Sequence, residues 1–126
     1  AALGMWRDRF WLGVGLGCYE PAYPAYRLVN WPLALGHAHN AYLNLLAETG
    51  LLGLLAYLLW LGLWGWRLVA TSRRHTGWRR GLALGLIGAW CQFATHSLVD
   101  HLLVNDVHLH IGLMLTLSAW LLTREG

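Results

Sequence analysis

The segment of residues 37–53 reads HAHNAYLNLLAETGLLG, and the rest of the chain is interpreted outward from it. Its polar head contains His37, His39 and Asn40, and the apolar stretch after residue 50 carries no charge before Arg67. Asparagine is a preferred helix N-cap because its side-chain oxygen accepts a hydrogen bond from the first turn. We therefore predict that a helix begins after Asn40 and that His39 lies just outside it.

A polar stripe continues along this predicted helix. Asn40, Asn44 and Glu48 recur at four-residue spacing and therefore share one face, while leucines cover the other faces. Such a stripe points toward something other than lipid. We expect Asn44 and Glu48 to belong to the same site as His37 and His39.

The composition is typical of a membrane protein. Hydrophobic residues make up 57% of the 126 residues, and charged residues only 12%. A helix needs about 20 apolar residues to cross a bilayer core. The sequence has no strand-like alternation and predicts an all-α integral membrane fold with about three transmembrane helices, at residues 51–69, 82–104 and 107–122.

Basic residues predict the orientation of these spans. The segment between the first two spans carries Arg73, Arg74, Arg79 and Arg80. Loops rich in arginine stay on the cytoplasmic side, so residues 70–81 are expected to form a cytoplasmic loop. Residues 1–50 and the turn at Asn105 and Asp106 are then on the outer side of the membrane, which in a bacterium is the periplasmic side. The net charge of +3 is too small to suggest nucleic acid as a partner.

The predicted periplasmic loop, residues 1–50, contains the HxHN motif and short amphipathic helices. Residues 5–12 mix aromatic and charged side chains, as in a short helix at a membrane surface. Glycines 13, 15 and 17 are expected to form a flexible turn, because they match no nucleotide-binding fingerprint. Three prolines between residues 19 and 32 predict an irregular loop.

The second span carries its own polar groups. Gln92, His96 and Asp100 recur at four-residue spacing, and titratable groups inside a membrane almost always face protein or a water-filled cavity. We expect His96 and Asp100 to face the same periplasmic cavity as the polar head. The remaining histidines of this region, His101, His108 and His110, are expected in the interfacial zone.

Histidine pairs also raise the question of a metal site. The pairs His37-x-His39 and His108-x-His110 could supply imidazole ligands. Their spacing fits no metal motif, so we expect neither a metal nor another cofactor.

One combination of motifs is specific. It consists of His39-Asn40, nine residues, Gly50, two residues and Gly53, preceded by the Gly-Val-Gly-Leu-Gly run of residues 13–17. This pattern resembles the O-antigen ligase and O-antigen polymerase family of bacterial membrane proteins. The chain begins at Ala1 without an initiator methionine. We expect it to be a fragment of a larger polytopic protein, and the resemblance implies a further arginine upstream of Ala1.

The resemblance implies a glycosyltransferase. Ligases of this family move a glycan from undecaprenyl diphosphate to a hydroxyl of the lipid A core, at the periplasmic face of the inner membrane. The matching residue for the general base is His39, and imidazole suits this role. Arg27 is the candidate for the diphosphate, because guanidinium matches phosphate oxygens in a two-pronged way.

The remaining site residues take supporting roles in this interpretation. His37, Asn44 and Glu48 are assigned with Arg27 to substrate binding. Asn40, His96 and Asp100 are expected to surround these residues without contacting the substrate. The expected partners are the lipid-linked glycan, the lipid A core or another glycan acceptor, and membrane lipids. Four alternatives stay open: an O-antigen polymerase, a protein O-oligosaccharyltransferase, a bicarbonate-type transporter and a purely structural membrane module.

Overall fold

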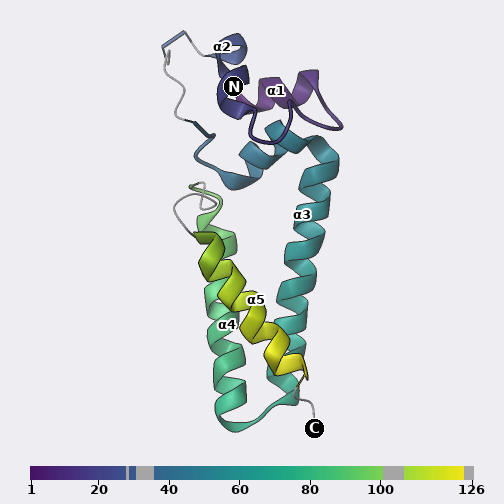
Figure 1. Ribbon diagram of the computed structural model, residues 1–126, viewed down its shortest axis with the longest axis vertical. Helices are drawn as coiled ribbons and strands as arrows, with labels where there is room; N and C mark the ends of the chain where they lie inside the picture. The colour runs from purple at the N-terminus through teal and green to yellow at the C-terminus, as the bar shows by residue number, and fades with distance from the viewer. Residues whose placement is uncertain (28, 31–35, 101–106, 124–126) are drawn as a thin grey trace. The chain divides into compact units, whose positions relative to one another are not determined.

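The computed structural model describes residues 1–27, 29–30, 36–100 and 107–123. The described residues form five helices and no strand, which confirms the all-α class (Figure 1). The helices are α1 (Ala2–Asp8), α2 (Tyr19–Tyr26), α3 (Ala41–Arg74), α4 (Gly77–His96) and α5 (Val107–Thr123).

The described residues divide into two compact units. Unit 1 contains those of residues 1–59 together with residues 96–100, and unit 2 contains residues 60–95 and 107–123. The polar head of the sequence lies entirely in unit 1. Helix α3 contributes its first part to unit 1 and its second part to unit 2.

Helix α3 is interrupted at Gly50. This residue has φ 67° and ψ −166°, which no helix contains, so α3 consists of two helical segments that meet at a kink. The last carbonyl groups of the first segment and the first amides of the second segment therefore have no hydrogen-bond partner within the helix.

The chain just after α1 supplies partners to both ends of this break. The Val14 and Gly15 amides donate to the carbonyls of Ala47 and Glu48, both at 2.9 Å. On the other side of the break, the Leu51 and Leu52 amides donate to the carbonyls of Phe10 and Trp11, at 2.9 and 3.3 Å. Residues 10–15 thus cap two helix ends at once, and we call this arrangement the glycine junction.

Two glycines allow the two backbones of the junction to approach each other. A Cβ at Gly50 would collide with the backbone of Trp11 and Leu12, and a Cβ at Gly13 with the backbone of Ala47 and Glu48. Both glycines also have positive φ, at 67°, which L side chains rarely adopt. The flexible turn expected for residues 13–17 is in fact a fixed backbone contact at residues 13–15.

Helices α1 and α2 form a small apolar core with the first segment of α3. Its buried members are Ala2, Met5, Tyr19, Tyr23 and Ala47. Met5 of α1 and Ala47 of α3 are fully inaccessible to solvent, so both helices contribute fully buried side chains to this core.

The irregular loop predicted from residue 19 to residue 32 is wrong for its first part, which forms α2. Pro21 lies in the first turn, where the missing amide has no helical partner to lose. Pro24 removes one internal hydrogen bond, but burial of Tyr19 and Tyr23 stabilises the eight-residue helix against this loss. The expected helix at residues 5–12 is also displaced, since α1 covers Ala2–Asp8.

Unit 2 is built from the second segment of α3 with α4 and α5. Trp64 of α3 donates its indole N–H to the Ser118 hydroxyl of α5, and Trp90 of α4 donates to the Leu61 carbonyl. The rings of Trp78 and Trp120 pack with centroids 5.7 Å apart, which joins α4 to α5. A cavity of about 290 Å³ lies between α3 and α5, lined mainly by apolar side chains together with Arg67, Thr71 and Ser118.

Among the described residues, α3 is the one helix long and apolar enough to cross a membrane. Helix α4 has 20 residues, but Arg79 and Arg80 at its start and Gln92 and His96 near its end make it less apolar. Helix α5 is apolar and has 17 residues. One candidate span is therefore observed, and the set of three spans stays a prediction.

The helix boundaries differ from the predicted ones at two places. Helix α3 continues to Arg74 and α4 begins at Gly77. The segment that connects these two helices is therefore shorter than the expected loop at residues 70–81. Helix α4 ends at His96 instead of reaching residue 104, because the amides of Val99 and Asp100 both donate to the His96 carbonyl and close the helix with a turn. His101, Asn105 and Asp106 lie outside the described residues.

Candidate functional site

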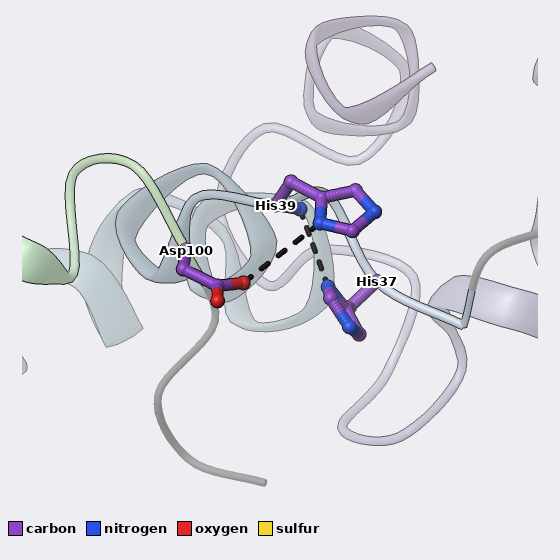
Figure 2. A group of neighbouring side chains, drawn as sticks. All are labelled: His37, His39 and Asp100. Carbon is purple, nitrogen blue, oxygen red and sulfur yellow. Dashed lines mark hydrogen bonds and ion pairs between the residues drawn. The ribbon is translucent and has the colours of Figure 1, made fainter.

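Three polar side chains of unit 1 lie together beside the start of α3. Figure 2 shows His37, His39 and Asp100 directed toward one another, although Asp100 is far from the two histidines in the sequence. The His39 Nδ1 atom is 3.8 Å from the Asp100 Oδ1 atom, and the two imidazole ring centroids are 4.5 Å apart. One ligand-type atom from each residue lies within 4.8 Å of the others. We call this group the histidine–aspartate cluster.

Both sides of the His39–Asp100 pair are accessible to solvent. The His39 side chain is 56% exposed and the Asp100 side chain 50% exposed. At 3.8 Å the contact is electrostatic rather than a hydrogen bond. The cluster can therefore meet a large substrate without first opening the protein.

Local backbone geometry fixes His39 at this position. His39 has φ 50°, in the left-handed region, where histidine is one of the more tolerated residue types. Its amide donates to His37 Nδ1 at 3.3 Å. The next residue, Asn40, caps α3 by accepting from the Leu43 amide at 2.9 Å, which confirms the predicted N-cap.

Asn40 also brings the Asp100 segment to the cluster. Its Nδ2 group donates to the Leu98 carbonyl at 2.7 Å, and the Ala41 amide donates to the Ser97 carbonyl at 2.9 Å. Ser97 is completely buried. These two bonds fasten the turn after α4 to the first residues of α3, so one asparagine both starts the helix and positions the carboxylate.

Asn44 and Glu48 lie on the predicted polar face, but their oxygens bind backbone within unit 1. Asn44 Oδ1 accepts from the Ala38 amide at 3.1 Å, and Glu48 Oε1 accepts from the Tyr19 amide at 3.0 Å. Both side chains are buried, with 4% and 8% of their surface exposed. Asn44 thereby holds the residue between the two histidines, and Glu48 holds the start of α2 against α3.

Burial acts on a neighbouring titratable group as well. It raises the pKa of the Tyr19 phenol, and the nearby Tyr23 phenol adds to the effect. Tyr19 is therefore neutral over the physiological range and contributes to the apolar core instead of carrying charge.

The side chains of Arg27 and His96, two further predicted site residues, are exposed to solvent. Arg27 is the C-cap residue of α2 and its side chain is exposed. His96 is exposed at the end of α4, and its backbone carbonyl, rather than its ring, closes the turn that leads to Asp100. His108 and His110 are exposed on α5, which belongs to unit 2.

The sequence predicts that Asp100 faces the same cavity as the polar head, but it does not predict the direct contact of Asp100 with His39. The four-residue spacing placed Asp100 on a helical stripe with His96, whereas the helix ends before Asp100. The glycine junction was missed as well. Its signal was present in the sequence, since the two glycines that need positive φ both belong to the motif pattern.

These observations first define a class: a helical protein with one candidate membrane span and an exposed histidine–aspartate cluster at a capped helix start. Residues 1–58 match the family model described as O-antigen ligase. Residues 1–58 are thus similar to the O-antigen ligase family, which agrees with the resemblance found in the motifs. It includes the glycine junction, His37 and His39, but not Asp100. The comparisons with curated proteins and with solved structures gave no match.

Proposed function

We propose that the protein containing this chain is an O-antigen ligase-type glycosyltransferase. It moves a glycan from undecaprenyl diphosphate to a hydroxyl of the lipid A core, at the periplasmic face of the bacterial inner membrane. The family match supports the ligase and polymerase class. The observation that carries the proposal is the exposed His39 ring beside the Asp100 carboxylate.

The proposed reaction uses His39 as the general base. Because Nδ1 of His39 faces Asp100, the other ring nitrogen, Nε2, is turned away from the carboxylate (Figure 2). In the reaction, Nε2 takes the proton of the acceptor hydroxyl while the hydroxyl oxygen bonds to the anomeric carbon. The bond between that carbon and the diphosphate oxygen breaks, and both electrons leave with undecaprenyl diphosphate.

Asp100 is proposed as a positioning residue for this base. A carboxylate near Nδ1 favours the tautomer that carries a proton there, which leaves Nε2 able to accept one. No metal ion takes part in these steps.

Binding of the leaving diphosphate is assigned to Arg27. Its exposed guanidinium offers paired donors to phosphate oxygens. His37 lies against His39 and is proposed to contact the acceptor sugar. Asn44 and Glu48 enter the proposal mainly as positioning residues, because their oxygens already accept from backbone amides; a direct substrate contact for either stays a prediction.

The test removes the base in the full-length protein. In a strain in which the gene is deleted, wild type, His39→Ala and His110→Ala are expressed, and lipopolysaccharide is examined on gels. His110 is the matched control, because it is an exposed histidine on α5. We expect wild type and His110→Ala to restore long glycans on the lipid A core. His39→Ala should reach the membrane and restore none, since a general base contributes about 10²–10⁴-fold to rate.

Other outcomes point elsewhere. Long glycans restored by His39→Ala would remove the base assignment. Cores capped by a single repeat in the deletion strain would identify a polymerase instead of a ligase. An unchanged ladder in the deletion strain would reject both and favour glycosylation of protein or transport.

A further inference from the structure

The histidine–aspartate cluster has a second chemical capacity that its proposed role as a base does not use. Two imidazoles and one carboxylate present N and O ligand atoms within 4.8 Å of one another. Zinc binds such sets with three protein ligands and leaves its fourth position open to water or substrate. The HxH spacing alone fitted no metal motif, and Asp100 supplies the third ligand that the sequence pattern lacked.

The distance between the ligand atoms of His39 and Asp100 is close to that in a metal site. Zinc–nitrogen bonds of 2.0–2.1 Å place tetrahedral ligand atoms about 3.3 Å apart. The His39–Asp100 distance is 3.8 Å, so closing onto an ion requires shifts of well under 1 Å for that pair. Both side chains are about half exposed, which leaves their rotamers room to make this adjustment.

The backbone beneath the cluster is fixed by hydrogen bonds on both sides. Ala38, between the two histidines, donates its amide to Asn44 Oδ1 at 3.1 Å. The segment that carries Asp100 is held by the bond from Asn40 Nδ2 to the Leu98 carbonyl at 2.7 Å. Ion binding therefore orders side chains without having to fold a loop, which lowers the entropic cost of binding.

We propose that His37, His39 and Asp100 form a binding site for a divalent transition-metal ion of the zinc class. Two imidazoles favour zinc or cobalt over magnesium, which prefers oxygen ligands in an octahedral arrangement. An ion bound between Nδ1 of His39 and Asp100 leaves the one proton of the neutral ring on Nε2, so Nε2 can no longer accept the proton of the acceptor hydroxyl. Zinc therefore inhibits glycan transfer. This inhibitory consequence rests on the proposed function, whereas metal binding itself does not.

The test measures binding directly on the full-length protein. The protein is purified in detergent, stripped with chelator and titrated with Co²⁺, whose visible absorption reports N and O ligation, and then with Zn²⁺ in competition. We expect one ion per chain, displacement of Co²⁺ by Zn²⁺ and no displacement by Mg²⁺. His37→Ala and Asp100→Asn should each weaken binding by about tenfold or more, as losses around metal sites commonly do.

The matched control is His110→Ala, which removes an exposed histidine of the other HxH pair and leaves the cluster intact. It should bind like wild type. Equal affinity of wild type, His37→Ala and Asp100→Asn would overturn the proposal. So would a loss of affinity in His110→Ala as large as that in Asp100→Asn.

A transfer assay with and without Zn²⁺ separates this proposal from the proposed function. Binding by the cluster with unchanged transfer would support the metal site and reject His39 as the base. Absence of binding, together with loss of transfer in His39→Ala, would reject the metal site and leave the glycosyltransferase standing. Binding together with inhibition that chelator reverses would support both.

Discussion

The glycine junction and the histidine–aspartate cluster lie at the two ends of the first segment of α3. The junction is made by backbone contacts, whereas the cluster is made by side chains. At the junction, four backbone hydrogen bonds join residues 10–15 to residues 47–52. The two backbones are so close that neither Gly13 nor Gly50 has room for a Cβ atom. At the cluster, the solvent-exposed side chains of His39 and Asp100 lie close together. The segment that carries Asp100 is held by the hydrogen bond from Asn40 to the Leu98 carbonyl. The junction fixes where the segment lies, and the cluster can therefore remain open to substrate.

This difference predicts unequal responses to mutation. The junction has no room for an added atom, so its smallest changes should have large effects on folding. The cluster tolerates changes of side chain structurally, so its changes should alter activity with little loss of folded protein.

The largest effect on folding is expected for Gly50→Ala. Gly50 has a positive φ with ψ near 180°, a conformation found essentially only for glycine, and it costs another residue about 1–3 kcal/mol. The new Cβ would also collide with the backbone of Trp11 and Leu12, which cannot move without breaking the junction's hydrogen bonds. We expect severe loss of folded protein, measured as the monodisperse fraction in size-exclusion chromatography of detergent extracts.

Gly62→Ala is the matched control, because a Cβ at Gly62 meets nothing within 4 Å and its φ is not positive. It lies in the same helix, and alanine there should be neutral or stabilise the helix by up to about 1 kcal/mol. Equal yields of folded Gly50→Ala and Gly62→Ala would contradict the described close approach at the junction.

The sequence predicted the local features of these two regions better than their partners. The Asn40 cap was predictable because a helix start depends on residues within one turn. The contact from Asn40 to Leu98 was not, since 58 residues separate them and only tertiary packing brings them together. The same limit explains why the sequence predicts Asp100 at the same cavity as the two histidines but not its direct contact with His39.

The proline pattern gave a wrong prediction for α2, and the hydropathy pattern gave a wrong end for α4, for a related reason. Prolines between residues 19 and 32 indicated a loop, but the buried faces of Tyr19 and Tyr23 stabilise α2. Hydropathy located α3 as a candidate span, whereas the end of α4 depends on the turn bonds to the His96 carbonyl. Burial and turn geometry are properties of the folded chain and were not contained in either pattern.

A smaller effect, and one that links the two regions, is expected at Asn40. Asn40→Ala removes both the cap and the bond to Leu98, whereas Asn40→Asp keeps an oxygen for the cap and loses only the donor. The alanine variant should lose about 1 kcal/mol of stability, and the aspartate variant less. Both should lower transfer, because the Asp100 segment is no longer fastened to the helix start.

The measurement for this pair combines thermal unfolding with the lipopolysaccharide gel. If Asn40→Asp transfers glycan as well as wild type, the bond to Leu98 does not position Asp100 for the reaction. If Asn40→Ala and wild type unfold at the same temperature, the cap contributes nothing to the segment.

The smallest effect is expected at an exposed hydrogen bond between α1 and α2. The Tyr26 hydroxyl donates to Asp8 Oδ2 at 2.8 Å and joins α2 to α1. This hydrogen bond to the carboxylate raises the pKa of the Tyr26 phenol above its ordinary value of 10.0. The folded state thus binds the phenol proton more tightly than the unfolded state, so the bond's contribution is complete below pH 10 and is lost as pH rises through the raised pKa.

Tyr26→Phe tests this sign directly, because it removes the hydroxyl and leaves the ring. We expect a slightly lower unfolding temperature than wild type at pH 8, and a difference that shrinks toward zero as the pH rises well above 10. Tyr26→Phe should leave glycan transfer unchanged, since the contact touches neither the glycine junction nor the cluster. A difference in unfolding temperature that grows with pH would contradict the direction of the shift and would mean that the ionised phenol, not the neutral one, is favoured in the folded protein.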